Sequence, residues 1–288
     1  AVTIRMQHSF IEMPENDYQP RFDDPRVGYF FDQANDMVST SATPYRDLIN
    51  RWNLEKRDPS AAISEPVEPI VWWIENTTPQ EFRPTIRAAV LQWNKAFEVA
   101  GFRNAVVVRE QPDDADWDAG DIRYNVLRWT SSPEPPFGGY GPSFMNPRTG
   151  QILGADIMLE YVFVTNRLRQ DRLFTAAALD MMEVFELMSF DDDQACSLGM
   201  HLHNNALFGP TALRATGASD VEVSEYIRQS LHYLLLHEVG HTLGLNHNMK
   251  ASQARPPEQL ADASLTAREG LLGSVMDYAP ANLALPGE

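Results

Sequence analysis

The sequence predicts an α+β fold in which a sheet, begun by a β-α-β unit, packs against a long helix near the C-terminal end. The β-α-β unit consists of an apolar strand at Ile70–Ile74, a helix over residues 82–100 and a second strand over residues 105–109. More strand-like segments follow up to residue 161, and the segments after it have helical periodicity. This order of strands and helices is typical of the α+β class.

Composition limits the class of protein. The chain has 288 residues, of which 43% are hydrophobic, enough for one large domain or two lobes. Its net charge of −17 disfavours binding to nucleic acid or to anionic membranes. No apolar run reaches 18 residues, so no membrane segment is predicted. The single cysteine, Cys196, excludes an internal disulfide bond.

Residues 1–65 form a lead-in that we expect to be an arm packed on the domain formed by the rest of the chain. Thr3 to Phe10 and Arg26 to Phe31 have strand-like composition, and Asp36 to Lys56 predicts a short helix. The alternative is an inhibitory segment that crosses a functional cleft of that domain, in which Asp23 or Asp24 is the blocking residue.

The helix of the β-α-β unit carries an apolar stripe with a 3.6-residue period. Thr78 to Glu81 resembles a capping box with proline at the first helical position. Pro84 is unfavourable inside a helix, so the regular part begins there. Gly101 ends the helix. The stripe consists of Phe82, Ile86, Ala89, Val90, Trp93, Phe97 and Ala100.

Three further strands are expected after this unit. They are Asp121 to Trp129, a short proline-bearing edge strand at Gly141–Met145, and Gln151 to Tyr161. Asp113 to Asp118 holds four aspartates in what we interpret as a solvated loop, with a Ca²⁺ site as the alternative.

Residues 162–216 are predicted to be helical, with breaks near Asp191 to Asp193 and at Gly209-Pro210. His201 and His203 are two apart and do not share a helix face, so we interpret them as ordinary polar residues. Nothing around Cys196 resembles a thiol that blocks a metal.

The last long helix carries the most specific pattern in the chain, H-E-x-x-H-x-x-G-x-x-H. A capping box at Ser219 to Glu222 starts this helix, and Ile227, Leu231, Leu234 and Leu235 give it an apolar face. His237 and His241 are four apart and project from one side, as two ligands of one zinc ion require. His232 lies off that side of the helix.

The remaining residues of the motif complete a catalytic zinc site. Glu238 cannot be a ligand beside the histidine pair, but it can take a proton from a zinc-bound water. Gly244 ends the helix, and the turn brings His247 back as the third ligand. Three protein ligands leave one position for water, which is the mark of a catalytic site.

The chain resembles the metzincin zinc endopeptidases in this motif and in Ser274-Val275-Met276-Asp277-Tyr278, which looks like their methionine turn. Segments Pro69 to Val108, Asp121 to Trp129 and Pro147 to Leu159 look like the catalytic region of large, poorly characterised bacterial zinc-dependent metalloproteases. The resemblance implies that Met276 supports the histidines from below. It also implies that Tyr278, two residues later, approaches the zinc and stabilises the oxyanion; the alternative is a tyrosine that only packs under the site.

The resemblance also implies the overall architecture. We expect a twisted, mostly parallel sheet with an antiparallel edge strand, an active-site helix, a helical insertion and a C-terminal lobe with the methionine turn. The peptidase domain would span residues 66–288, with an upper lobe at 66–247, an insertion at 162–218 and a lower lobe at 248–288. A peptide or protein substrate would lie extended along the edge strand, at about Gly139 to Met145.

The expected function is that of a zinc endopeptidase with one catalytic Zn²⁺. Two alternatives are a non-catalytic zinc-containing binding domain and a zinc hydrolase of a non-peptide amide or glycopeptide. A glutamate as third ligand, Glu258 or Glu269, is less favoured than the correctly spaced His247. We expect a fragment of a larger bacterial protein, exported to the periplasm, the cell surface or the medium.

Overall fold

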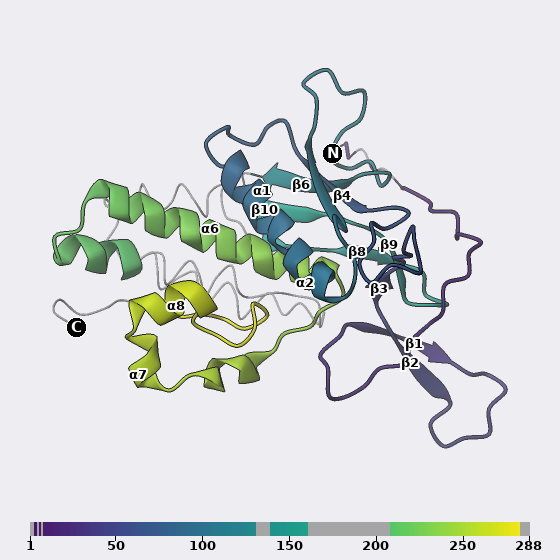
Figure 1. Cartoon of the computed structure of the whole chain (residues 1–288). Helices are drawn as coiled ribbons and strands as arrows, with labels where there is room; N and C mark the ends of the chain where they lie inside the picture. Colours follow the sequence, from purple (N-terminus) through teal and green to yellow (C-terminus); the bar gives the residue numbers. More distant parts are fainter. Residues whose placement is uncertain (1–2, 5, 7, 131–138, 161–207, 283–288) are drawn as a thin grey trace.

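The computed structural model describes residues 3–4, 6, 8–130, 139–160 and 208–282 (Figure 1). Its strands are β1 Phe31–Asn35, β2 Tyr45–Ile49, β3 Arg51–Trp52, β4 Ile70–Ile74, β5 Val106–Glu110, β6 Asn125–Thr130, β7 Gly139–Tyr140, β8 Ser143–Met145, β9 Gln151–Ala155 and β10 Ile157–Glu160. Its helices are α1 Arg83–Gln92, α2 Asn94–Val99, α6 Asp220–Thr242, the 3-10 helix η2 Met249–Ala254, α7 Pro257–Leu260 and α8 Ala263–Glu269.

A five-stranded sheet with the order β5-β4-β6-β10-β7 forms the centre of the molecule. The pairs β4–β5, β4–β6 and β6–β10 are parallel, and β7 pairs antiparallel with β10 at the edge. The predicted combination of a mostly parallel sheet and an antiparallel edge strand is present, but the edge strand predicted at Gly141–Met145 is wrong in part. β8 of that segment lies in a second sheet, and β7, directly before Gly141, forms the antiparallel edge. The segment predicted as one strand over Gln151 to Tyr161 is two strands, because the chain moves at Asp156 from a second sheet into this one.

The second sheet has the order β3-β9-β8 and joins the N-terminal part of the chain to the segment before the central sheet. β3 pairs parallel with β9, and β8 pairs antiparallel with β9. The short helix expected within Asp36 to Lys56 is wrong. That stretch contains β2, which pairs with β1 in a separate hairpin, and β3, so backbone partners elsewhere in the chain decide its conformation.

The strand prediction for Thr3 to Phe10 is also wrong, and the one for Arg26 to Phe31 is met only in part. The described residues between Thr3 and Phe10 have no strand, and β1 begins only at Phe31. Between Arg26 and Phe30 the chain forms one isolated bridge, from Tyr29 to Leu245. The division of the chain into an arm, an upper lobe and a lower lobe stays a prediction.

Helix α1 begins where Pro84 predicted, at Arg83, and the apolar stripe faces the core. The capping box predicted at Thr78 to Glu81 is wrong: the N-cap is Phe82, and no side chain caps it. These residues form turns before the helix, and the Arg83 side chain binds the Thr78 carbonyl oxygen, at 2.9 Å. The helix is interrupted at Trp93, and Gly101, with φ +90°, follows the end of α2.

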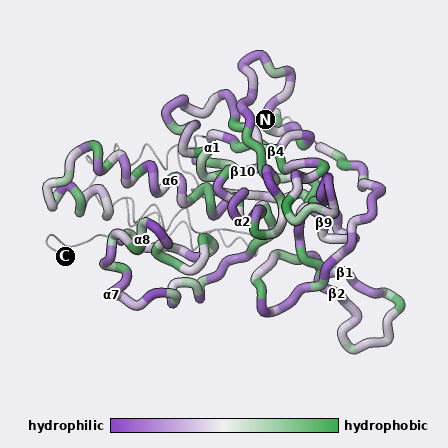
Figure 2. The backbone as a smooth tube through the Cα atoms, in the orientation of Figure 1, coloured by the Kyte–Doolittle hydropathy of each residue, from purple (hydrophilic) through white to green (hydrophobic). Residues whose placement is uncertain are grey.

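One hydrophobic core joins the central sheet to α1 and to the C-terminal half of α6. It contains Trp72 and Ile74 of β4, Ile86 of α1, and Leu234 and Leu235 of α6, all fully buried. The apolar stretches of β4 and β9 run through the middle of the molecule (Figure 2). Among the described helices, none is long and apolar enough to cross a membrane.

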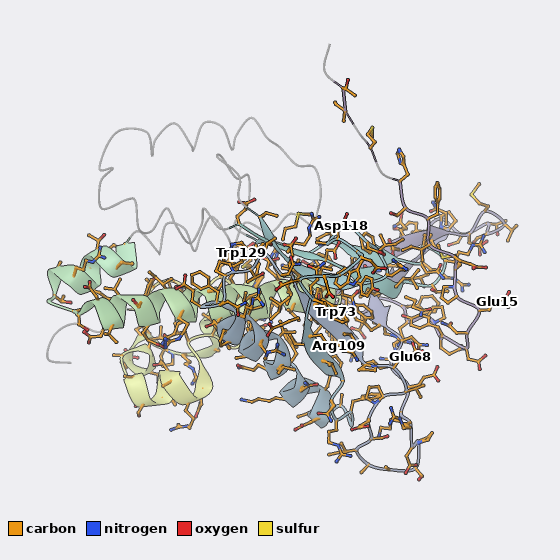
Figure 3. All side chains as sticks on the ribbon, turned by 90° about the horizontal axis from the view of Figure 1, so that it is seen from above. Glu15, Glu68, Trp73, Arg109, Asp118 and Trp129 are labelled. Atoms are coloured by element: carbon orange, nitrogen blue, oxygen red, sulfur yellow. The ribbon has the colours of Figure 1, made fainter. Side chains whose placement is uncertain are left out.

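On the other face of β4, Trp73 belongs to an aromatic cluster with Trp117 and Tyr124. The Arg109 guanidinium of β5 lies 5.4 Å from the centre of the Trp73 ring (Figure 3). This cluster packs the loop after β5 onto the sheet.

The predicted insertion lies mostly outside the described residues, and so do His201, His203 and Cys196. Residues 208–215, which include Gly209-Pro210, are helical. The residues before them, where a break near Gly209-Pro210 would also fall, lie outside the described part of the chain.

Gly244 follows the end of helix α6, and a larger residue at this position would force the neighbouring backbone to move. Gly244 has φ +94°, and a Cβ built on it would overlap the backbone carbonyl oxygen of Asn50. Both the left-handed backbone and the close approach of a distant segment therefore require glycine at this position.

We predict that Gly244→Ala lowers the free energy of unfolding by more than about 2 kcal/mol, since it adds a steric overlap to left-handed strain. Gly217→Ala is the matched control. Gly217 has φ +87° but no atom within 4 Å of a built Cβ, so strain alone should cost about 1 kcal/mol. Urea unfolding of both metal-free variants measures the difference. Equal losses would show that the contact with Asn50 does not constrain the helix end.

Candidate metal centre

The metal centre is built at the C-terminal end of helix α6. The helix starts at the predicted capping box, in which the Ser219 side chain accepts from the Glu222 amide and the Glu222 carboxylate accepts from the Ser219 amide. Its exposed first turns give way to a continuous buried stretch from Leu234 to Thr242. Burying a polar helix end is unfavourable unless its polar groups find partners, so this end of the helix needs an explanation.

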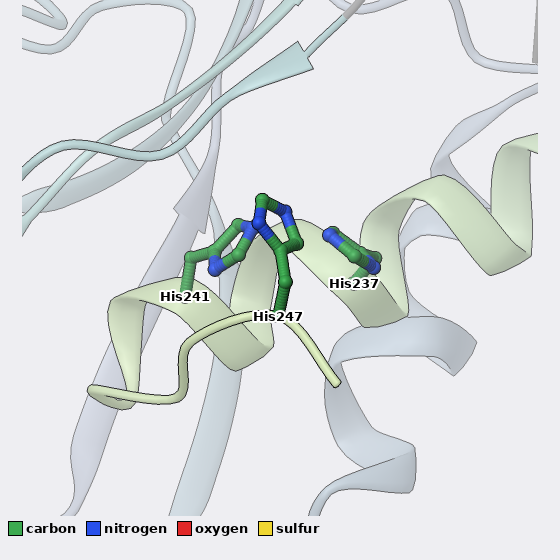
Figure 4. A group of neighbouring side chains, drawn as sticks. All are labelled: His237, His241 and His247. Carbon is green, nitrogen blue, oxygen red and sulfur yellow. The ribbon is translucent and has the colours of Figure 1, made fainter. Parts of the chain in front are cut away.

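Three histidines come together there (Figure 4). One ring nitrogen from each of His237, His241 and His247 lies within 4.8 Å of the others, and these three residues are the one group among the described residues that could hold a metal. His237 and His241 are buried on one side of α6, and the turn after Gly244 brings His247 opposite them. The three residues that the sequence pattern selected as ligands are therefore adjacent.

The rings are held so that one nitrogen of each is directed to the common point. His237 Nδ1 lies 2.7 Å from the Val275 carbonyl oxygen, and His241 Nδ1 lies 2.9 Å from the Leu245 carbonyl oxygen. A carbonyl can only accept, so each of these two Nδ1 atoms carries the proton and each Nε2 is unprotonated. His241 Nε2 is buried and has no hydrogen-bond partner among the described residues. A buried nitrogen lone pair of this kind fits a metal ion.

Burial keeps these imidazoles neutral. Desolvation lowers the pKa of His237 to about 3 and that of His241 to about 4, and it lowers the pKa of His247 as well. Part of this lowering at His237 and His241 comes from the neighbouring imidazoles. Near neutral pH all three rings are unprotonated at the coordinating nitrogen, which is the state that binds a metal.

Glu238 is fully buried beside the triad. A Cβ built on Gly141 would lie 3.1 Å from the Glu238 carbonyl oxygen and 3.6 Å from Glu238 Oε2. Gly141 directly follows β7, so the antiparallel edge of the central sheet passes over the carboxylate. The chain thus places the predicted general base between the predicted metal ligands and the edge strand.

The methionine turn lies beneath the helix. Met276 is 3% exposed, and a Cβ built on Gly240 would overlap its Sδ atom. Gly240 lies between the two histidines of α6, so the thioether fills the space that a side chain at position 240 would need. The Met276 carbonyl oxygen also accepts from the Asn248 amide, at 2.8 Å, which fixes the chain directly after His247.

Tyr278 reaches the metal centre from the same turn. Its hydroxyl oxygen lies 3.1 Å from His247 Nε2, and its ring centre lies 5.1 Å from that of His247. The hydroxyl thus lies at a ring nitrogen of the third histidine of the triad, a position that packing beneath the histidines would not require. The geometry favours the interpretation in which Tyr278 approaches the metal.

Several residues of the site were not found from the sequence. The Tyr233 hydroxyl donates to the Asp277 carbonyl oxygen and accepts from the Ala279 amide, which ties the methionine turn to α6. Trp93 Nε1 donates to the Leu236 carbonyl oxygen, at 3.1 Å. Phe30 and Trp52, from the N-terminal part of the chain, also touch this end of the helix. These contacts join residues far apart in sequence, so no local pattern indicates them.

Other candidate ligands lie elsewhere. Asp24 is paired with Arg26, and neither Asp23 nor Asp24 belongs to the metal group, so the inhibitory alternative has no support among the described residues. Glu258 and Glu269 are also outside the group, and Glu269 pairs with Arg255 and Arg268.

Two further predictions concern residues outside the triad. His232 Nε2 faces Gln92, as expected for a residue off the ligand side. No metal group forms at Asp113 to Asp118 among the described residues.

Comparison with known proteins agrees with this geometry. Residues 219–288 match a family model described as Met-zincin. Residues 1–57 match a family model described as a domain of unknown function (DUF5117). No curated protein matches the chain. No solved structure matches it either. The family match over residues 219–288 and the histidine triad together support a metzincin-like zinc metalloprotease domain in this part of the chain.

Proposed function

We propose that this protein is a zinc-dependent endopeptidase. The observation that carries the proposal is that three histidine nitrogens lie within 4.8 Å of one another next to a buried carboxylate. That carboxylate belongs to Glu238, on the same helix as His237 and His241. A structural zinc site has no use for a buried carboxylate that is not a ligand, whereas hydrolysis requires a base next to the metal. This arrangement favours hydrolysis over a non-catalytic binding role.

The donor set fits zinc. Three neutral imidazoles from His237, His241 and His247 supply the nitrogen ligands that zinc prefers, and they leave a fourth position for water. Zinc, when bound there, polarises the scissile carbonyl and lowers the pKa of water. The Val275 and Leu245 carbonyl oxygens hold the two α6 imidazoles in the tautomer that coordinates.

Glu238 is the proposed general base. Its carboxylate takes a proton from the attacking water and then delivers that proton to the leaving amine nitrogen when the C–N bond breaks. The fully buried position excludes bulk water and strengthens the interaction of the carboxylate with the reacting groups.

Tyr278 is the proposed oxyanion donor. The carbonyl oxygen of the substrate gains negative charge when water attacks, and a phenol hydroxyl can donate a hydrogen bond to it. The Tyr278 hydroxyl lies 3.1 Å from His247 Nε2 and is therefore already at the reaction centre.

An extended peptide is the proposed substrate. Among the described strands, β7 forms the edge of the central sheet and leads to Gly141 over Glu238. A substrate strand added to this edge would bring its scissile bond to the base.

A pocket of about 400 Å³ lies beside α6, between Tyr233 and Leu236 on the helix and Leu272, Val275 and Ala279 on the C-terminal segment. Because Val275 also binds His237, this pocket borders the metal centre and could accept a substrate side chain. Export from the cell stays a prediction from the resemblance.

The first prediction concerns the metal. The purified protein should contain about one zinc per chain, and His247→Ala should lower its zinc affinity strongly because one of three ligands is lost. His232→Ala is the matched control, since His232 is on the same helix but outside the triad. Metal analysis and a competing chelator measure both. Unchanged zinc affinity in His247→Ala would refute the assignment of His247 as the third ligand.

The second prediction concerns the base. Glu238→Gln should keep zinc and thermal stability but lower casein hydrolysis by at least about 10²-fold, since the proton acceptor is lost. Glu225→Gln, a change on the exposed part of the same helix, should leave the rate unchanged. Substantial hydrolysis by zinc-loaded Glu238→Gln would require another base.

The third prediction concerns Tyr278. Tyr278→Phe should lower kcat by about 10²–10³-fold with KM nearly unchanged, because the hydrogen bond exists only in the transition state. Tyr124→Phe, a change in the aromatic cluster of the sheet, serves as the control. Steady-state kinetics on zinc-loaded protein decide the matter, and an unchanged kcat would leave Tyr278 with a packing role alone.

A further inference from the structure

The N-terminal part of the chain is paired with the loop that joins the second histidine to the third. Phe30 N–H donates to the Gly244 carbonyl oxygen, at 2.8 Å, and Asn246 N–H donates to the Gly28 carbonyl oxygen, at 3.0 Å. Between them, Tyr29 and Leu245 form an antiparallel bridge. Segment 28–30 therefore acts as a short strand beside segment 244–246, although more than 200 residues separate them in the sequence.

Side chains strengthen this pairing. Trp52 Nε1 donates to the Thr242 carbonyl oxygen, at 2.8 Å, and so satisfies one of the carbonyls left open at the end of α6. The Phe30 ring lies against the His241 imidazole, with 5.3 Å between ring centres. Asn50, which is buried, donates its amide N–H to the Phe30 carbonyl oxygen and touches Gly244.

The paired loop is the one that orients two metal ligands. The Leu245 carbonyl oxygen binds Nδ1 of His241, so the position of Leu245 fixes that imidazole. A Cβ built on Gly28 would lie 3.5 Å from the His247 carbonyl oxygen, so the same N-terminal segment touches the backbone of the third ligand. Partners that orient metal ligands typically change metal affinity by about 10- to 100-fold when they are removed.

The segment is itself anchored. β3, which contains Trp52, pairs with β9 in the sheet that also contains β8, and Arg51 N–H donates to the Gly150 carbonyl oxygen, at 3.1 Å. The pairing of segments 28–30 and 244–246 is thus connected to the sheet next to Gly141 and Glu238.

From these contacts we infer that residues 28–52, within the part of the chain that matches a domain of unknown function, position the metal centre by holding the loop between His241 and His247. Phe30 and Trp52 are positioning residues in this arrangement. The inference rests on the metal binding in the proposed function and not on the hydrolysis. This role is the opposite of inhibition. Weakening the contact between the segment and the loop should lower metal affinity, whereas weakening an inhibitory contact would raise activity.

The first experiment uses the unaltered chain. If the segment favours the metal-binding form of the loop, zinc must in return stabilise the segment, since coupling between two sites is reciprocal. Adding zinc to the metal-free protein should slow hydrogen exchange at the amides of Phe30 and Asn246 by about fivefold or more. The amides of the β1–β2 hairpin beyond Gln33 are the internal control and should not respond. Unchanged exchange at Phe30 and Asn246 in zinc-loaded protein would overturn the inference.

The second experiment measures zinc release to a chromogenic chelator. Trp52→Phe keeps a ring but removes the donor to Thr242, and it should speed zinc release by about 10-fold. Trp73→Phe, the same change in the aromatic cluster of β4, should release zinc at the rate of the unaltered protein. A merely structural role for Trp52 would lower the melting temperatures of metal-free and zinc-loaded protein equally and leave zinc release unchanged, which would overturn the inference. Slower release or higher activity would also overturn it, in favour of an inhibitory segment.

The two proposals fail in different ways. If zinc slows hydrogen exchange at Phe30 but the protein does not hydrolyse casein, the peptidase proposal is refuted and the positioning role is supported. If the protein hydrolyses casein and Trp52→Phe releases zinc at the normal rate, the peptidase proposal is supported and the positioning role is refuted.

Discussion

The structure depends on burying three neutral imidazoles at the end of one helix. Burial lowers the pKa values of His237 and His241 far below the ordinary value for histidine, so the rings stay uncharged. An uncharged ring still has one N–H that needs an acceptor and one lone pair that needs a donor or a metal. The two N–H groups are satisfied by the Val275 and Leu245 carbonyl oxygens. These two carbonyls must be held in place, and the loops that contain Val275 and Leu245 hold them.

Each of these loops packs closely against a glycine, which explains why positions 240 and 244 carry no side chain. Gly240 leaves room for Met276, whose turn carries Val275. Gly244 leaves room for Asn50, whose segment holds the loop that carries Leu245. A side chain at either position would push the corresponding carbonyl away from its imidazole. The two glycines are therefore as much a part of the metal centre as the ligands are.

The sequence predicted those parts of the fold that local patterns determine. β4 and the apolar stripe of α1 follow from hydrophobic periodicity, and the capping box at Ser219 and the end of α6 at Gly244 follow from local backbone chemistry. The histidine spacing identified the triad for the same reason, because helix geometry alone places His237 and His241 together. The β1–β2 hairpin and β3 were missed, since Arg51 and Trp52 become a strand only by pairing with Gln151 and Ile152, a hundred residues later. Tyr233, Phe30 and Trp52 were missed as parts of the site because their partners are also far away in the sequence, 44 residues for Tyr233 and 190 for Trp52.

The same non-local contacts bear on how the chain is divided. The two family matches lie at its opposite ends, over residues 1–57 and 219–288, as though they were independent parts. In space, segment 28–30 pairs with segment 244–246, and Trp52 satisfies the end of the metal-binding helix. Independent folding units normally meet through few contacts, whereas here the contacts reach backbone groups next to the ligands. A domain boundary at residue 57 would separate segment 28–30 and Trp52 from the metal centre that they contact. The unit that must fold together to hold the three imidazoles therefore includes residues from both of these parts of the chain.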